Sequence, residues 1–187
     1  NVCSVKEATA DLANMRRTRE CCGPDYRIMS GDDGMTYEMM TDSAINAAGV
    51  ISVAANVAPG AVSKMVQLIN GGKQTEAKTL MLKLAPLFSL VTVKTTEKTP
   101  FGEVVCRARN PVAYKALMSI LGMPAGVCRP PLGKLTQNGV NVVLEAARKV
   151  HVNTPDILQP VADFFNVDIG QRLENPENWE GLYYEDY

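Results

Sequence analysis

The residue best placed to do chemistry is Lys6, at the carboxyl end of the first predicted strand. Alternation along a strand puts Lys6 on the same face as Val2 and Ser4. A lysine among small or apolar side chains is desolvated, and desolvation favours its neutral amine. A neutral amine can attack a ketone and form a Schiff base. The alternative is an ordinary strand-end lysine that reaches solvent.

A second set of candidates lies in the turn Ser30–Gly34, after the second predicted strand. The adjacent acids Asp32 and Asp33 have no third ligand at a suitable spacing, which argues against a metal site. We therefore expect Asp33 to cap the next helix. Gly31 is of more interest, because a residue without a side chain lets its backbone carbonyl approach a ligand.

Other kinds of site find little support in the sequence. The single histidine, His151, nearly excludes Ser–His and Cys–His nucleophiles and the two-histidine metal motif. The five cysteines form no C-x-x-C pair, which predicts a reduced, intracellular chain that uses thiols as small apolar residues. No glycines have the spacing of a phosphate-binding loop.

Charge and hydropathy exclude two classes of partner. The net charge is −1, from 19 Lys and Arg against 20 Asp and Glu. The chain therefore lacks the excess of basic residues that nucleic-acid binding usually requires. The longest apolar runs fall well short of the roughly 20 residues that a membrane span requires. We therefore expect a protein that binds neither nucleic acid nor membrane.

The elements that position Lys6 and Gly31 alternate between strands and helices over residues 1–72. Strands are expected at 1–5, 26–29 and 49–57. Helices are expected between a cap at Thr9 or Asp11 and an end at Gly23, over about 36–44, and over 59–70. The last of these helices carries an apolar stripe of Val62, Met65, Val66 and Ile69. This alternation predicts parallel β/α units, whose carboxyl strand ends gather at one edge.

Residues 73–151 have a different pattern, which predicts a helical domain. Helices are expected at 75–91, 111–121 and 137–150, and 92–109 is expected to be β-rich or irregular and to form a loop. Residues 152–187 add one helix, 155–165, and an acidic segment interleaved with aromatic residues. That segment is either a solvated tail or a strip that docks on this chain or on a neighbouring subunit.

Several of these segments resemble one known family, the pyruvate-dependent class I aldolases related to N-acetylneuraminate lyase. Val2–Ala8 is similar to the family's Schiff-base strand. Ser30–Asp33 and Gly49–Val57 resemble the dihydrodipicolinate synthase branch of that family. Asn110-Pro111, shortly before Tyr114–Leu117, resembles the Asn-Pro stretch that opens a helix in the family's C-terminal domain. The resemblance runs from residue 1 to about residue 150.

The resemblance implies that residues 1–72 are the last three β/α units, strands six to eight, of a (β/α)8 TIM barrel. It implies that Lys6 forms an imine with pyruvate, and that the enamine condenses with L-aspartate 4-semialdehyde in lysine and diaminopimelate biosynthesis. Gly31 would border the substrate through its carbonyl, and Ile51 would flank the pyruvate moiety. The family implies no metal or organic cofactor, a homotetramer and a cytoplasmic location, or a plastid if the source is a plant.

The chain also departs from the family pattern. Strands one to five are absent, and with them the carboxylate donors, the tyrosine relay and the aldehyde-binding arginine. The segment Val91–Arg109 is longer than the corresponding link between helices in the family. The residues after Val150 have no recognised counterpart in the family. We therefore expect this chain alone to be inactive, for want of substrate positioning and proton transfer.

Two other functions stay open. One is a sibling pyruvate aldolase, such as a sugar-acid lyase, because aldehyde choice resides largely in the absent half. The other is a non-catalytic β/α module whose acidic aromatic tail binds a partner protein.

Overall fold

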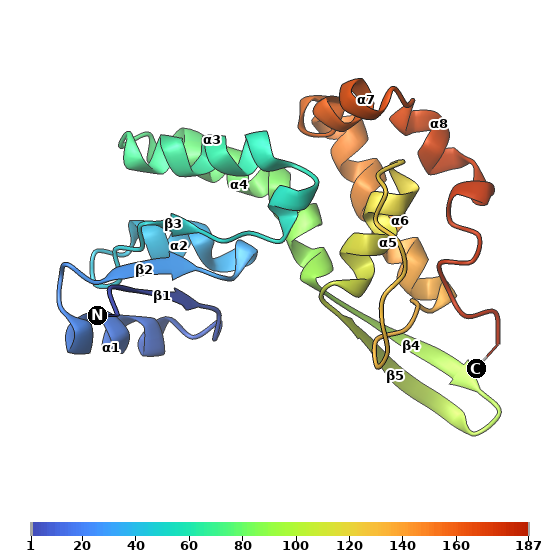
Figure 1. Ribbon diagram of the computed structural model, residues 1–187, viewed down its shortest axis with the longest axis horizontal. Helices are drawn as coiled ribbons and strands as arrows, with labels where there is room; N and C mark the ends of the chain where they lie inside the picture. Colours follow the sequence, from blue (N-terminus) through green and yellow to red (C-terminus); the bar gives the residue numbers. More distant parts are fainter. Residues whose placement is uncertain (1, 187) are drawn as a thin grey trace. The chain divides into compact units, whose positions relative to one another are not determined.

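The computed structural model describes residues 2–186, and its fold is mixed α/β (Figure 1). It contains two compact units, Asn1–Ala85 and Pro86–Tyr187, called unit 1 and unit 2 below. They divide inside helix α4 (Gln74–Phe88), whereas the sequence pattern places a boundary after residue 72. Helix α6 (Gln137–Asn153) likewise runs through the boundary expected after residue 151.

Unit 1 is built on a parallel sheet with strand order β1-β2-β3 (Figure 1). The strands are β1 (Ser4–Glu7), β2 (Arg27–Ser30) and β3 (Gly49–Val50). Helices α1 (Leu12–Cys22), α2 (Thr36–Thr41) and α3 (Pro59–Asn70) alternate with them. The predicted alternation of strands and helices is confirmed.

Local sequence signals explain where these helices begin and end. The carboxylate of Asp11 accepts hydrogen bonds from the backbone N–H groups of Ala13 and Asn14, which otherwise have no partner inside α1. Gly23, with φ of 83°, terminates α1 in a conformation that a side chain would oppose. Pro59 opens α3, and Val62, Met65 and Ile69 of the predicted stripe are buried, whereas Val66 is half-buried.

The strand expected over 49–57 is wrong beyond Val50. Only Gly49 and Val50 belong to β3, and a 3-10 turn follows at Ala54–Asn56. The chain turns there because the Asp33 carboxylate accepts the backbone N–H groups of Val53 and Ala54. Apolar, β-branched composition favours a strand locally, but this long-range hydrogen bonding overrides it.

Unit 2 contains a feature that the sequence pattern misassigned. Residues 92–109 form an antiparallel hairpin of β4 (Thr92–Thr99) and β5 (Gly102–Arg109), so the expected loop and the purely helical domain are both wrong. The helices α5 (Val112–Ile120), α6, α7 (Gln159–Phe165) and α8 (Ile169–Glu174) follow. Short 3-10 turns occupy 89–91, 155–157 and 176–178.

The core of unit 2 is apolar and closely packed. Helices α5 and α6 bring together Leu117, Ile120 and Val143, none of which is exposed to solvent. Tyr114 is also buried, and its hydroxyl donates a hydrogen bond to the carbonyl of Leu87 at 2.7 Å. A buried tyrosine needs such a partner, since an unpaired hydroxyl in an apolar core is costly.

The acidic C-terminal segment docks on its own chain through backbone hydrogen bonds. Leu135 and Tyr183 form a parallel bridge, with Leu135 N–H bonded to the carbonyl of Leu182 and Tyr184 N–H bonded to that of Leu135. The acidic side chains around this bridge stay exposed. None of the helices among residues 2–186 is both long and apolar enough to cross a membrane.

Candidate functional site

The carboxyl edge of the sheet in unit 1 brings the three predicted site residues together. Lys6 lies next to the end of β1, Gly31 follows β2 and Ile51 follows β3. Backbone hydrogen bonds extend the sheet to this edge, because Gly31 N–H donates to the carbonyl of Glu7 and Ile51 N–H donates to that of Ser30. In parallel β/α folds, this is the edge where reactive groups collect.

Lys6 and Gly31 are in direct contact. A Cβ built on Gly31 would lie 2.7 Å from Lys6 Cε, 2.9 Å from Lys6 Cγ and 2.9 Å from the Cβ of Ala8. The stem of Lys6 therefore passes over the backbone of Gly31, and a larger residue would displace it. The sequence singles out Gly31 because its backbone carbonyl can approach a ligand. The structure adds a second reason for glycine here, the close approach of the Lys6 side chain.

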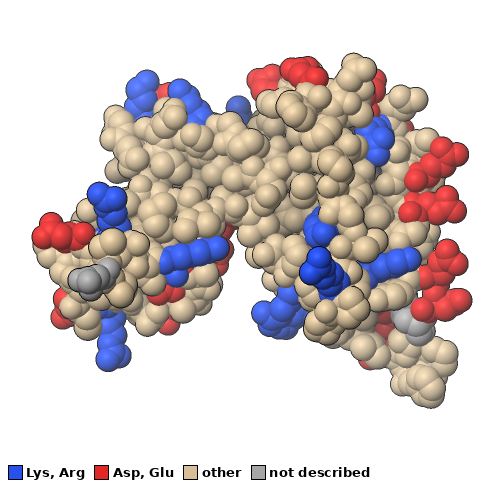
Figure 2. Space-filling view, viewed as in Figure 1, with Lys and Arg blue, Asp and Glu red and all other residues tan. Residues whose placement is uncertain are grey.

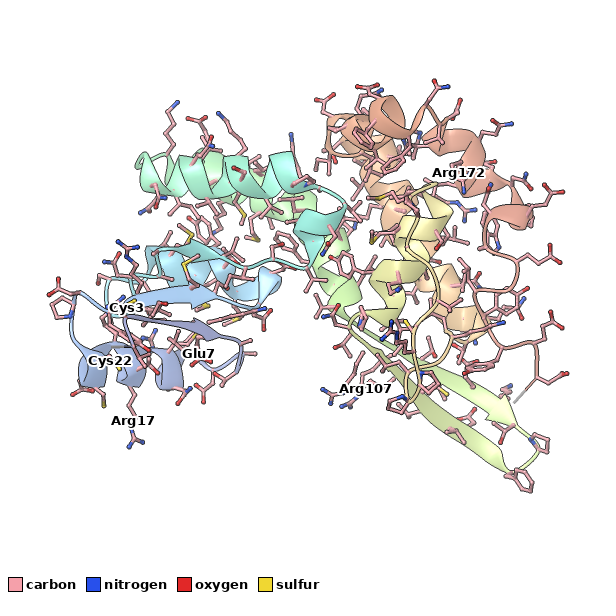
Figure 3. All side chains as sticks on the ribbon, viewed as in Figure 1. Cys3, Glu7, Arg17, Cys22, Arg107 and Arg172 are labelled. Carbon is pink, nitrogen blue, oxygen red and sulfur yellow. The ribbon has the colours of Figure 1, made fainter. Side chains whose placement is uncertain are left out.

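The sequence pattern predicts that Lys6 is desolvated, but in the structure of residues 2–186 the Lys6 side chain is exposed. The buried residue at this strand end is its neighbour Glu7, which is 8% exposed and lies between β1 and α1 (Figure 3). The Glu7 carboxylate accepts the backbone N–H of Thr9 at 2.8 Å and the side-chain amide of Asn14 at 3.3 Å. Because successive side chains of a strand point to opposite faces, Glu7 faces α1 and Lys6 lies on the other face of the sheet.

Asp33 connects the loop after β2 to the loop after β3 at the carboxyl edge of the sheet. The sequence did not predict this role. The expected cap is wrong, because the Asp33 side chain bonds to no N–H of the following helix. Its Oδ2 accepts the backbone N–H groups of Val53 at 3.0 Å and Ala54 at 2.9 Å, just beyond Ile51. Asp33 is 2% exposed, and its Oδ1 is buried without a hydrogen-bond partner in the described structure.

Two buried hydroxyls hold the turn that begins at Gly31. Ser30 and Thr36 are both inaccessible to solvent, and their hydroxyl oxygens lie 3.0 Å apart. Each is also within hydrogen-bonding distance of the Asp32 carbonyl. The Ser-Gly-Asp-Asp motif predicts a turn, but no local signal shows that Ser30, Asp33 and Thr36 are buried.

The described residues contain no metal-binding cluster, and their cysteines are unbridged. No group of three or more His, Cys, Asp or Glu side chains in residues 2–186 is arranged to hold a metal ion. The five cysteines are free thiols. Cys3, Cys21 and Cys22 are exposed, so the expectation that the thiols serve as small apolar residues is wrong for these three.

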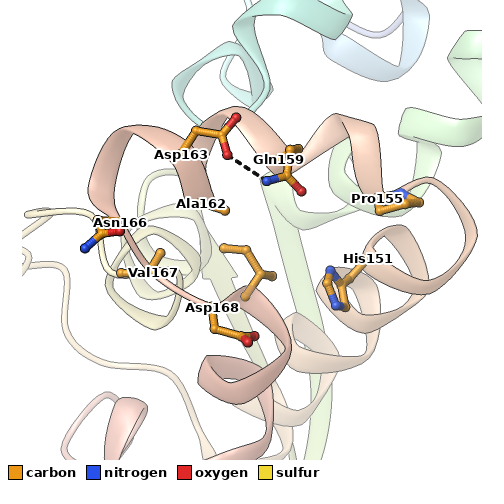
Figure 4. A pocket seen from close by; sticks show the side chains of 9 residues that line it. His151, Pro155, Gln159, Ala162, Asp163, Asn166, Val167 and Asp168 are labelled. Carbon is orange, nitrogen blue, oxygen red and sulfur yellow. Dashed lines mark hydrogen bonds between the residues drawn. The ribbon is translucent and has the colours of Figure 1, made fainter.

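The cavities in unit 2 lie apart from the predicted site residues. One of about 650 Å³ is lined by His151 of α6, Gln159 and Asp163 of α7, and Asp168 at the start of α8 (Figure 4). Gln159 donates a hydrogen bond to Asp163 at 2.7 Å. A smaller cavity of about 290 Å³ lies beside the hairpin and includes Tyr184. Neither contains Lys6, Gly31 or Ile51.

Comparison with known proteins gives consistent matches. The profile of the Dihydrodipicolinate synthetase family matches residues 1–149. The 4-hydroxy-tetrahydrodipicolinate synthase of Methanoculleus marisnigri is 34% identical over 154 residues, which cover 82% of this chain and 46% of that protein. The solved 4-hydroxy-tetrahydrodipicolinate synthase of Methylacidiphilum fumariolicum SolV superposes with a TM-score of 0.66 at 26% identity, covering 86% of this chain and 46% of that one.

A further solved structure is the dihydrodipicolinate synthase of Acinetobacter baumannii complexed with pyruvate. It has a TM-score of 0.62 and 27% identity, and the match covers 79% of this chain and 45% of that one. The chain thus spans less than half the length of each of these three relatives. The range matched by the family profile contains Lys6, Gly31 and Ile51 and ends before His151. This chain belongs to the dihydrodipicolinate synthetase family.

Proposed function

We propose that the chain is the carboxyl-terminal part of a pyruvate-dependent class I aldolase. In this proposal β1, β2 and β3 are strands six, seven and eight of a (β/α)8 barrel, and the residues from α4 onward form the domain that follows it. The parallel strand order and the intervening helices support this assignment. So does the coverage of less than half of each relative.

Lys6 is the imine-forming residue in this proposal. Its unprotonated Nζ attacks the ketone carbon of pyruvate, and loss of water from the adduct gives the imine. Loss of a proton from the pyruvate methyl group gives the enamine, whose carbon attacks an aldehyde. Hydrolysis of the imine then releases the product and regenerates the amine. Gly31 borders the bound substrate, and Ile51 flanks its pyruvate portion.

One observation carries the proposal: the Lys6 stem lies against Gly31 at the carboxyl edge of a parallel sheet. The names of the relatives support L-aspartate 4-semialdehyde as the aldehyde, which places the reaction on the route to lysine and diaminopimelate. The pyruvate complex of the Acinetobacter baumannii relative supports pyruvate as the first substrate. The homotetramer and the cytoplasmic location stay predictions from the resemblance.

We expect the chain alone to be inactive. An exposed lysine can form a reversible imine, but turnover also requires groups that hold the pyruvate carboxylate and move protons. Residues 2–186 place no such group beside Lys6 that we can assign. A polypeptide that supplies strands one to five would complete the pocket.

The test is borohydride trapping with pyruvate, followed by peptide mass analysis. The chain is assayed alone and after fusion to the part of the Methanoculleus marisnigri enzyme that precedes the matched region. We expect an adduct on Lys6 in the fusion, and none in a Lys6→Arg fusion. Pyruvate consumption by the fusion is then measured with aspartate semialdehyde and, separately, with sugar aldehydes.

The outcomes separate the three functions. Consumption that depends on aspartate semialdehyde supports the proposal, whereas consumption with a sugar aldehyde only identifies a sibling aldolase. A folded fusion that gives no adduct on Lys6 contradicts the aldolase assignment and favours the non-catalytic module.

A further inference from the structure

The β4–β5 hairpin presents one strongly cationic face. The register pairs Lys94 with Arg107 and Lys98 with Glu103, and it pairs Thr92 with Arg109. Directly paired residues point to the same side of a ribbon, so these side chains share one face. Lys94, Lys98, Arg107 and Arg109 are all exposed there. We call these four residues the cationic face. Its edge also carries one exposed acid, Glu103, opposite Lys98.

The opposite face of the hairpin packs on its own unit, so the cationic face points away from it. Val93 and Glu97 alternate with the cations along β4 and are buried, at 3% and 2% exposure. Glu97 accepts a hydrogen bond from Asn138 of α6 at 2.7 Å, and the hydroxyls of Thr95 and Thr136 lie 3.1 Å apart. The opposite, outward side of the ribbon does not take part in this packing, and its charged side chains are exposed.

The cationic face carries an uncompensated repulsion. Lys94 and Arg107 are directly opposite each other across the two strands, and like charges in that position destabilise a sheet. The ion pairs found in residues 2–186 are Arg16–Asp42 and Lys73–Glu76, and neither involves the hairpin. An anionic partner would remove this repulsion.

The same face has an apolar centre. Val105, paired with Thr96, lies between the cations and is 64% exposed. An exposed apolar residue surrounded by charge is common in interfaces, where burial contributes affinity and the charges orient the partner.

Unit 2 also carries a segment with complementary properties. Residues 173–187 contain five acids and no Lys or Arg. The structure leaves all five exposed: Glu174, Glu177, Glu180, Glu185 and Asp186. Figure 2 shows acidic side chains gathered along one flank of unit 2. Tyr184, 46% exposed, interrupts the acids just as Val105 interrupts the cations.

We propose that two copies of this chain associate through these surfaces, the cationic face of one against residues 174–186 of the other. Because both surfaces lie on the same unit, each copy can give and receive one contact, as in a two-fold dimer. The inference is independent of the proposed aldolase activity, since it uses no residue of the carboxyl edge.

The chain's own acidic segment does not neutralise its hairpin. The bridge between Leu135 and Tyr183 fixes where the segment lies, and no ion pair joins it to the hairpin in the part of the chain that the structure describes. Arg172, the nearest cation before the segment, donates instead to the carbonyls of Ser119 and Ile120. The acids are thus left for a second molecule.

Sedimentation velocity of the full 187-residue chain tests the proposal. We expect self-association at about 0.1 M salt that weakens by about tenfold or more at about 1 M, where the screening length falls from about 10 Å to about 3 Å. The paired reversals Lys94→Glu with Arg107→Glu, and Glu177→Lys with Glu180→Lys, should each lower the low-salt association constant by a similar factor. An equimolar mixture of the two variants should regain it.

The matched control reverses two exposed lysines of α4, Lys78→Glu with Lys83→Glu, and should associate as the unmodified chain does. Circular dichroism verifies that each variant is folded. A monomeric unmodified chain overturns the proposal, and so does association that salt leaves unchanged. If reversing the hairpin weakens association but reversing the acids does not, the hairpin binds something other than residues 174–186 and the proposal fails.

Discussion

Both units have an apolar core, but they differ in the polar side chains that they bury. Four of the five buried polar residues among residues 2–186 belong to unit 1, and they cluster around the carboxyl edge of its sheet: Glu7, Ser30, Asp33 and Thr36. Unit 2 buries Glu97 and otherwise a continuous apolar core that includes Tyr114 and Leu117. The two regions are therefore stabilised in different ways.

The difference follows from what each region must position. Apolar packing stabilises in proportion to the area removed from water and has little directional preference. Hydrogen bonds depend on distance and angle, so Asp33 can hold the backbone at Val53 and Ala54 in one place. In unit 1, such hydrogen bonds hold the loops after β2 and β3, which contain Gly31 and Ile51. Unit 2 uses the apolar core for stability.

The largest effect should come from a cavity in unit 2. Leu117→Ala removes a fully buried side chain from α5, and we expect a loss of about 3 kcal/mol in the free energy of unfolding. Val152→Ala in α6 is the control, because Val152 is 76% exposed and should change stability by less than about 0.5 kcal/mol. Urea unfolding measures both, and equal effects would contradict the description of unit 2.

A smaller loss should follow removal of the hydrogen-bonding carboxylate in unit 1. Asp33→Ala leaves the N–H groups of Val53 and Ala54 without their acceptor, and we expect about 2 kcal/mol of destabilisation. Asp33→Asn keeps one acceptor oxygen and should recover part of it. Asp32→Ala is the matched control, since the Asp32 side chain makes no cap hydrogen bond. Hydrogen exchange at Val53 and Ala54 locates the effect, which should be absent in the control.

The next effect concerns the contact between Lys6 and Gly31. Gly31→Ala places a Cβ within 3 Å of Lys6 and of Ala8, and the required shift should cost about 1 kcal/mol. In the fusion described above, it should also lower the rate of borohydride trapping at Lys6. Gly60→Ala is the control, because nothing lies within 4 Å of a Cβ there. Unchanged trapping in Gly31→Ala would remove the steric role assigned to Gly31.

The smallest effect is a pH dependence in unit 1. The pKa of Asp42 is lowered by the backbone N–H of Ala44 and by the side chain of Arg16, 2.7 Å away. Because the folded pKa lies below 3.8, this stabilisation is present above that pH and is lost as pH falls through the folded value. The exposed position makes it small. The difference in unfolding midpoint between the protein and Asp42→Asn should therefore shrink from pH 7 to pH 3, and a difference that stays constant over this range would contradict the prediction.

Local sequence signals predicted the helices well. The apolar stripe Val62, Met65 and Ile69 and the bounding Pro59 and Gly71 define α3, and the structure confirms it within one residue at each end. Such signals suffice because a helix satisfies its backbone hydrogen bonds internally and only its apolar face depends on the rest of the fold.

For residues 92–109 the sequence predicted a β-rich or irregular loop, and it did not predict the antiparallel hairpin. Thr95 and Glu97 interrupt the apolar residues on its packed face, so the apolar alternation that marks a half-buried strand is weak. The turn signal at Pro100 and Gly102 was present, and Gly102 has φ of 113°. Together with the β-branched residues on either side, that turn could have indicated a hairpin.

The sequence by itself determined the alternation of strands and helices in unit 1, the bounds of α3, and the placement of Lys6 at the end of one strand and of Gly31 just after the next. Only the tertiary structure decided that β3 stops at Val50, that Glu7 and Asp33 are buried, and that the Lys6 stem rests on Gly31. Caps, stripes and turns are local, so neighbouring residues encode them. Burial and hydrogen bonds between distant loops depend on which segments meet after folding, and no short stretch of sequence records that.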